Sequence, residues 1–220
     1  MTKSALAQIE AQMDPVLQTA GRLFRAQGYS ATTVREIAAA ANILPGSLHY
    51  RYASKEDLLL ALIDHGIERA TNAVRAAIEG ADDPLDRLRA ALRAHLSLLV
   101  HDDVSIYVLL YEGRSLSGHS RAQMARRRDR YDALWDGMLH EAAGTGRIRP
   151  DADLRLVRLL LLGAANWTAQ WFSPKGKYSA DAIADAFLEI VWNGLAKPGG
   201  ARVLSLVERS TRPRREKRHD

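Results

Sequence analysis

The sequence of 220 residues predicts an all-α protein with about nine helices. Apolar residues recur at three- and four-residue spacing almost throughout, and no segment shows the alternating pattern of a half-buried strand. Helix start signals recur too, in which Asp, Ser or Thr precedes a proline or stands three residues before an acid. With 47% hydrophobic and 26% charged residues, the composition is that of a globular protein with a substantial core.

The first two predicted helices lie in the N-terminal part of the sequence. Asp14 caps the first, Pro15 takes its first helical position, and Gly28 ends it. Thr33 and Glu36 form a capping box, in which the threonine hydroxyl accepts from one free amide and the glutamate accepts from another. This box opens a second helix that is only two turns long.

A turn and a third short helix follow. Asn42 tolerates the left-handed conformation that a tight turn needs, and Pro45 starts a helix that ends near residue 52. The second and third helices have the spacing of a helix-turn-helix. The third is too polar to add much core. Its polar side chains are expected to face the groove and suit hydrogen bonding to phosphates or base edges: Ser47, His49, Tyr50 and Arg51.

Six longer helices are expected after this segment. Ser54 opens one that runs to about residue 79, and Asp83 with Pro84 repeats the signal of a cap followed by proline. The expected ranges of the last five are 84–100, 104–114, 120–143, 153–172 and 179–195. We therefore predict an N-terminal arm and helix-turn-helix domain over 1–58, a larger helical domain over 59–196, and a basic tail over 197–220.

The net charge of +5 resides in the tail. Residues 197–220 contain eight Lys and Arg and three acids, so the rest of the chain is neutral and global charge is weak support for nucleic-acid binding. A disordered, solvated tail is the simplest interpretation, and added non-specific DNA affinity is the alternative. The sequence has no cysteine, which excludes disulfides and thiolate metal sites.

Residues 28–58, GYSATTVREIAAAANILPGSLHYRYASKEDL, resemble the DNA-binding domain of TetR-family transcriptional regulators. The resemblance covers about residues 14–60 and implies a small N-terminal DNA-binding domain followed by a helical domain that binds an effector and dimerises. It implies phosphate contacts for Thr33 and Lys55 at helix starts. The full set of implied DNA contacts is Thr33, Arg35, Leu44, Pro45, Gly46, Ser47, His49, Tyr50 and Lys55.

Two positions depart from the family pattern. Asn42 replaces the usual glycine of the turn, which is physically acceptable because asparagine adopts positive φ. Leu44 replaces the usual polar cap, which leaves the start of the third helix less well satisfied.

The C-terminal half, around LLGAANWTAQWFSPKG (161–176), resembles TetR regulators of lipid, steroid or aromatic-acid breakdown. Several of those respond to acyl-CoA thioesters, so the resemblance implies a hydrophobic acid or acyl-CoA effector. The expected pocket residues are Tyr107, Tyr111, Arg114, Trp135, Met138, Trp167 and Trp171. Each aromatic fits a core position equally well, and Arg114 fits a salt bridge with Glu112 or a neighbouring acid equally well.

The two helices over 153–172 and 179–195 are apolar over more than one stripe, so one side is expected to meet a second subunit. The expected interface residues are Leu156, Leu160, Ala164, Ile183, Phe187 and Ile190. A dimer also suits a short recognition helix, because two copies related by a two-fold axis can contact a pseudo-palindromic site.

We therefore predict a homodimeric repressor that binds double-stranded DNA and is released by a small effector. We expect no catalytic or metal site, no cofactor and no membrane contact, because the sequence lacks the common catalytic motifs and any long apolar run. Without an apolar N-terminal signal, the protein is expected in the cytoplasm. The alternatives are an activator, a ligand-independent DNA binder, and, from another class, an all-helical enzyme or lipid-binding protein.

Overall fold

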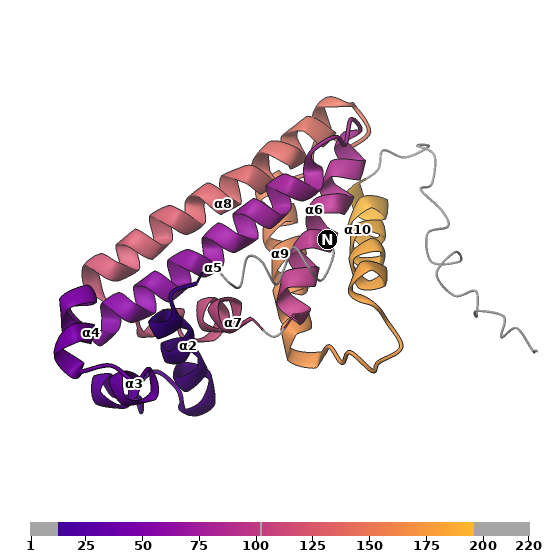
Figure 1. Cartoon of the computed structure of the whole chain (residues 1–220). Helices are drawn as coiled ribbons and strands as arrows, with labels where there is room; N and C mark the ends of the chain where they lie inside the picture. The colour runs from indigo at the N-terminus through magenta and orange to yellow at the C-terminus, as the bar shows by residue number, and fades with distance from the viewer. Residues whose placement is uncertain (1–12, 102, 196–220) are drawn as a thin grey trace, which may run out of the picture. The chain divides into compact units, whose positions relative to one another are not determined.

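The computed structural model describes residues 13–101 and 103–195, and within them every regular element is a helix (Figure 1), which confirms the predicted fold class. None of these helices is long and apolar enough to cross a membrane. The predicted N-terminal arm up to residue 12 and the basic tail over 197–220 lie outside the described residues. The helices are α2 Pro15–Gln27, α3 Val34–Ala40, α4 Pro45–Arg51, α5 Lys55–Ile78, α6 Pro84–Val100, α7 Val104–Tyr111, the 3₁₀ helix η1 Gly113–Ser115, α8 Gly118–Gly144, α9 Leu154–Trp171 and α10 Ala180–Leu195.

One compact unit contains α2 to α5, α7, η1 and α8 as far as Trp135. Figure 1 shows α2, α3 and α4 gathered around the beginning of α5, and α8 running alongside α5. The backbone N–H of Ser117 donates to the Glu56 carboxylate at 2.8 Å, and the Arg127 guanidinium lies 2.9 Å from the Asp64 carboxylate. These two contacts hold α8 along α5.

The first turn of α7 packs closely against both α2 and α5. A Cβ on Gly66 would lie 2.8 Å from the carbonyl oxygen of Ser105, so α5 can approach the α7 backbone only with a glycine there. A Cβ on Gly21 would lie 3.0 Å from the side chain of Val104, so α2 also approaches closely. A buried ion pair between Arg69 of α5 and Asp103 at the start of α7 accompanies this packing.

The second compact unit contains α6, α9, α10 and the rest of α8. Arg93 of α6 donates to the Asp185 carboxylate of α10 at 2.9 Å, and Arg158 of α9 donates to Asp136 of α8 at 2.7 Å. Its core is apolar, with Leu88, Leu92, Leu161, Ala165, Leu188 and Trp192 all buried. The division into compact units does not follow the predicted domain boundary at residue 58. Helices α5, α7 and most of α8 belong to the same unit as the N-terminal helices.

Candidate nucleic-acid interface

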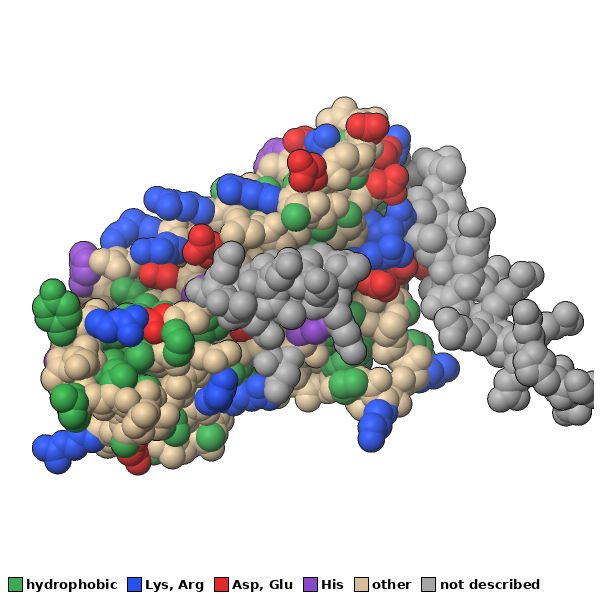
Figure 2. Space-filling view, in the orientation of Figure 1, with side chains coloured by type: hydrophobic (Ala, Val, Ile, Leu, Met, Phe, Trp, Pro, Cys, Tyr) green, Lys and Arg blue, Asp and Glu red, His purple; other side chains and the backbone are tan. Residues whose placement is uncertain are grey.

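Helix α4 turns almost all of its side chains outward. Its single buried residue is Leu48, which is 0% exposed and anchors the helix to the unit. Pro45, Gly46, Ser47 and His49 are exposed, and Tyr50 is 94% exposed. Figure 2 shows hydrophobic side chains standing out at the end of the unit where α4 lies. One core residue holds the helix, and the rest of its side-chain surface is exposed.

The turn before α4 has the geometry of a helix-turn-helix. Asn42 has a φ of 54°, which confirms its expected left-handed conformation. Its backbone N–H donates to the carbonyl of Ala39 at 3.1 Å, and the N–H of Ile43 donates to that of Ala38 at 3.0 Å. These bonds satisfy the end of α3 and set the direction in which α4 leaves it.

Helix α3 begins with the predicted capping box. The hydroxyl of Thr33 accepts from the N–H of Glu36 at 3.2 Å, and the Glu36 carboxylate accepts from the N–H of Thr33 at 2.7 Å. The bond from the Thr33 N–H holds the pKa of Glu36 below its usual value. The neighbouring Arg35 is exposed and has no ion-pair partner within the described part of the chain, so its guanidinium is available for a phosphate.

Lys55, the first residue of α5, points inward. Its ammonium donates to the carbonyls of Tyr29 and Thr32, both at 2.8 Å, and lies 4.2 Å from the centre of the Tyr29 ring. The group holds the segment between α2 and α3 against α5. Only its third N–H remains for the phosphate contact predicted from the sequence.

An interaction that the sequence did not predict links α4 to α2. Asp14 caps α2 by accepting from the N–H of Val16 at 2.9 Å, and it also forms an ion pair with Arg51. The Tyr52 hydroxyl donates to the same carboxylate at 3.0 Å, and burial together with this bond raises the pKa of Tyr52 to about 12. Arg51 was expected to face the groove, so its placement beside Asp14 corrects that expectation. The cap at Asp14 was visible in the sequence, but partners 37 and 38 residues away were not.

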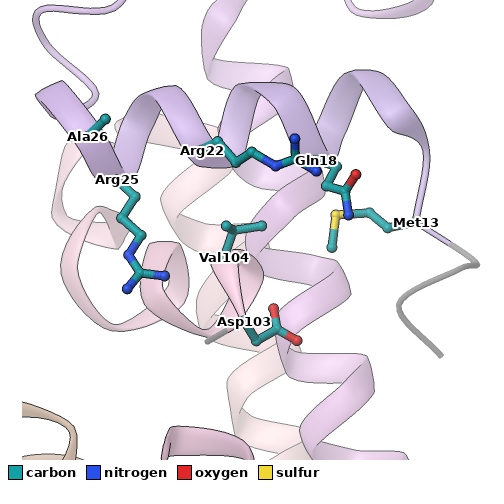
Figure 3. A pocket seen from close by; sticks show the side chains of 7 residues that line it. All are labelled: Met13, Gln18, Arg22, Arg25, Ala26, Asp103 and Val104. Carbon is teal, nitrogen blue, oxygen red and sulfur yellow. The ribbon is translucent and has the colours of Figure 1, made fainter. Parts of the chain in front are cut away.

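A pocket of about 540 Å³ lies between α2 and the start of α7 (Figure 3). Its lining is Met13, Gln18, Arg22, Arg25, Ala26, Asp103 and Val104. The Arg25 guanidinium lies 5.3 Å from the centre of the Tyr107 ring, and Asp103 is paired with Arg69. The buried polar group of the pocket is therefore already engaged within the protein.

The predicted effector residues are divided between the two compact units. In the first unit, Trp135 is fully buried. Arg114 is exposed and forms no ion pair with Glu112 or another described residue. Tyr107 and Tyr111 are half-buried, with ring centres 4.6 Å apart.

In the second unit, Met138 is buried, but Trp167 and Trp171 are 65% and 47% exposed. This exposure excludes the alternative that these two tryptophans are core residues, and their place in an effector pocket stays a prediction.

A buried polar pair in the second unit was not singled out as an effector contact. The imidazole Nε2 of His95 on α6 lies 3.1 Å from the amide oxygen of Asn166 on α9. Burial lowers the pKa of His95 to about 4, with the bond to Asn166 acting in the opposite direction. His95 is therefore neutral near pH 7 and presents a polar edge inside an apolar helix layer. Its spacing in the sequence is that of an ordinary core residue, so only the fold reveals the pairing.

Helices α9 and α10 expose large apolar side chains. Leu156, Leu160 and Ile190 are 63%, 64% and 70% exposed. Ala164 and Phe187 are half-buried beside them. Ile183 is 5% exposed, so its expected place in an interface is corrected: it belongs to the core of its own unit. Exposed leucines along one helix indicate a surface that is covered by a partner.

Comparisons with known proteins agree with this architecture. Residues 16–62 match the model of bacterial regulatory proteins of the tetR family, and residues 81–195 match the model of tetracyclin repressor-like C-terminal domains. The second match alone spans more than half of the chain.

Individual relatives cover most of the chain. The HTH-type transcriptional repressor KstR2 of Mycobacterium tuberculosis is 28% identical over 87% of this chain and 96% of its own length. The crystal structure of AibR in complex with isovaleryl coenzyme A and operator DNA is 29% identical, covers 80% of this chain and 96% of AibR, and has a TM-score of 0.73. The structure of superantigen PfiT is 34% identical, covers 84% of this chain and 99% of PfiT, and also has a TM-score of 0.73.

Both halves of the sequence thus match models of one family, and the helix-turn-helix of that family is present in the fold. The chain belongs to the TetR family of bacterial transcriptional regulators.

Proposed function

We propose that this regulator is a repressor that binds a pseudo-palindromic operator as a homodimer and leaves it when a hydrophobic acid or its CoA thioester binds. The outward face of α4, with exposed Ser47, His49 and Tyr50 on the second helix of a helix-turn-helix, is the observation that carries the DNA-binding part. The name of KstR2 as a repressor and the complex of AibR with operator DNA support the same conclusion.

The DNA contacts divide by chemistry. Arg35 and the third N–H of Lys55 supply charge for phosphates, and Thr33 contributes the start of α3. The side chains of Ser47, His49 and Tyr50 reach base edges or the adjoining sugar-phosphate backbone. We propose residues 1–58 as the part that binds DNA and 59–196 as the part that binds effector and dimerises, although helix packing groups α5 and α7 with the N-terminal helices.

The effector class is inferred from relatives and from the second unit. AibR was crystallised with isovaleryl coenzyme A, an acyl thioester with a short branched chain. In this chain, the second unit supplies apolar surface for an acyl chain, and the neutral His95 bonded to Asn166 adds one polar pair to the layer between α6 and α9. Release from DNA requires that the effector bind the released conformation more tightly than the DNA-bound one.

The start of α7 is the proposed route of the signal within the first unit. Helix α5 begins beside the DNA-binding helices, and its middle contacts α7 through Gly66 and the pair of Arg69 with Asp103. A shift of α7 therefore displaces α5. In a dimer, such a shift changes the separation of two α4 helices, which must lie about 34–36 Å apart to enter successive major grooves.

Fluorescence anisotropy tests the DNA-binding part. The purified protein should bind DNA from upstream of its own gene, or a site selected from random duplexes, with an affinity that falls linearly in log–log plots against salt. Each phosphate contact contributes about −0.9 to that slope. Equal affinity for all DNA sequences at every salt concentration would refute the proposal that the protein is an operator-specific repressor.

A thermal-shift panel tests the effector part. Isovaleryl-CoA, longer acyl-CoAs, the free acids and CoA alone are compared at equal concentrations, because a ligand that binds only the native state raises its melting temperature. A thioester should stabilise the protein and lower its affinity for the operator. Equal stabilisation by CoA alone would show that the protein does not recognise the acyl group.

A further inference from the structure

Leu44 is a large apolar side chain in an unusual place. It is 74% exposed and occupies the N-cap position of α4, where it makes no side-chain cap bond. Serine, threonine, asparagine or aspartate would accept a hydrogen bond from the first turn at this position. Leucine offers neither a cap nor burial to the folded chain.

The local geometry explains how the helix tolerates this residue. Pro45 follows at the first helical position and has no N–H to satisfy. The N–H of Ser47 donates to the carbonyl of Leu44 at 3.0 Å, so a backbone acceptor replaces the missing polar cap. The side chain of Leu44 is thus free of a structural role within its own unit, unlike Leu48 one turn later, which is fully buried.

The surroundings of Leu44 are those of the DNA-binding face. It lies at the start of the helix whose exposed face carries Ser47, His49 and Tyr50. The first residues of a recognition helix are the ones that meet base edges in the major groove. The major groove contains one apolar group, the C5 methyl of thymine, which side chains such as alanine, threonine and phenylalanine contact.

We propose that Leu44 is a specificity residue that recognises a thymine methyl, so that each operator half-site contains a T·A pair where α4 begins. The inference rests on the proposed function and adds to it the identity of one base pair in each half-site. An exposed leucine is apolar and has no hydrogen-bonding group. It therefore favours thymine over cytosine by contact with the methyl group alone.

Deoxyuridine tests the contact directly because it removes the methyl group and keeps the base pairing. In the operator found above, each thymine is replaced in turn, symmetrically in the two half-sites, and affinity is measured at fixed salt. For wild type, one position should lose about four-fold affinity per half-site, the effect of leaving one methyl group unburied. At the same position, 5-methylcytosine should bind better than cytosine.

The variants Leu44→Ala and Leu44→Ser identify the side chain responsible. Leu44 is exposed, so both variants should keep the helical circular dichroism of wild type. Leu44→Ala should also keep its melting temperature, and Leu44→Ser should melt at the same temperature or higher because serine restores a cap. Leu44→Ser has no apolar side chain and should bind the thymine and deoxyuridine operators within roughly two-fold of each other. Leu44→Ala keeps only one methyl group and should show a smaller methyl effect than wild type. Tyr50→Ala is the matched control, because it truncates another exposed side chain of α4 and should leave the methyl effect intact.

The outcomes separate the inference from the function. Specific binding with a methyl effect that persists at full size in Leu44→Ser, or with no methyl effect at any thymine, overturns the assignment of Leu44 and leaves the repressor standing. Absence of any specific binding by wild type overturns both.

Discussion

The ammonium group of Lys55 shares its three N–H donors between the protein and the solvent. Two donate to the carbonyls of Tyr29 and Thr32, and the positive charge lies over the Tyr29 ring. Both carbonyls belong to the segment between α2 and α3, so this side chain fixes the DNA-binding helices on the start of α5. A phosphate contact by the third donor would place DNA against the same rigid junction.

Replacement of Lys55 by methionine keeps the aliphatic stem and removes the donors. Because two partly buried carbonyls lose a charged partner, the free energy of unfolding should fall by about 1–3 kcal/mol. Affinity should fall alike for the operator and for scrambled DNA, since a phosphate contact is blind to sequence. Urea unfolding and anisotropy measure the two effects.

Lys175→Met is the control for Lys55→Met, because Lys175 is exposed in the segment between α9 and α10. It should leave both the unfolding midpoint and DNA affinity close to wild type. A Lys55→Met midpoint equal to that of the control would show that the two hydrogen bonds add nothing to stability.

The beginning of α7 is an element held by one carboxylate. Asp103 accepts from the N–H and the hydroxyl of Ser105, both at 2.7 Å, and forms the buried ion pair with Arg69 of α5. Cap and ion pair use the same side chain, so α7 cannot move away from α5 without exposing or unpairing a charge. This coupling is what a signal from effector to DNA-binding helices requires.

Substitutions at Asp103 separate the two contributions. Asp103→Ala removes cap and charge and should lower the free energy of unfolding by about 3–5 kcal/mol, because Arg69 is left buried and unpaired. Asp103→Asn keeps a capping oxygen and should lie between this variant and wild type. Combining Asp103→Asn with Arg69→Met should recover part of the loss, since no buried charge then lacks a partner.

Asp153→Ala provides the matched cap control. Asp153 caps α9 in the same way, accepting from Arg155 N–H at 3.0 Å, but it is exposed and has no ion-pair partner among the described residues. Its loss should cost about 1 kcal/mol. If Asp103→Ala and Asp153→Ala lower the denaturation midpoint by the same amount, the ion pair with Arg69 does not stabilise α7.

Helix starts were predictable because their signals are local. The caps at Thr33 and Ser54 have their partners three residues away, and α3 and α5 begin where these caps indicate. The burial of individual apolar residues was not predictable. Periodicity shows which face of a helix is apolar, but it does not show which element packs against that face. Trp167 and Ile183 both fit an apolar stripe, yet the first is exposed and the second is buried. Long-range contacts such as that of Asp14 with Arg51 leave no local sequence pattern at all.

At the scale of the whole molecule, the exposed leucines of α9 explain why a single copy is incomplete. Leu156, Leu160 and Trp167 recur at four- and seven-residue spacing on one side of the helix, and Ile190 of α10 is exposed as well. Burial of such a stripe against its symmetry mate stabilises a two-fold dimer. The same symmetry lets two short α4 helices contact two half-sites, which neither could bind tightly alone.

Leu160→Glu places a charge in the middle of this stripe and should convert the dimer into a folded monomer. Light scattering coupled to size-exclusion chromatography measures the mass, and anisotropy compares the full operator with an isolated half-site. Affinity for the full operator should fall on the order of 100-fold or more, to the value for a half-site, because the second contact is no longer intramolecular.

Two control variants separate the dimer interface from charge and from stability. Arg155→Glu, which adds a carboxylate to α9 away from the stripe, should remain dimeric. Ile183→Ala should lower the free energy of unfolding by about 2–5 kcal/mol as a core truncation while the folded protein still dimerises. A Leu160→Glu protein that stays dimeric and binds the full operator normally would place the interface elsewhere on the molecule.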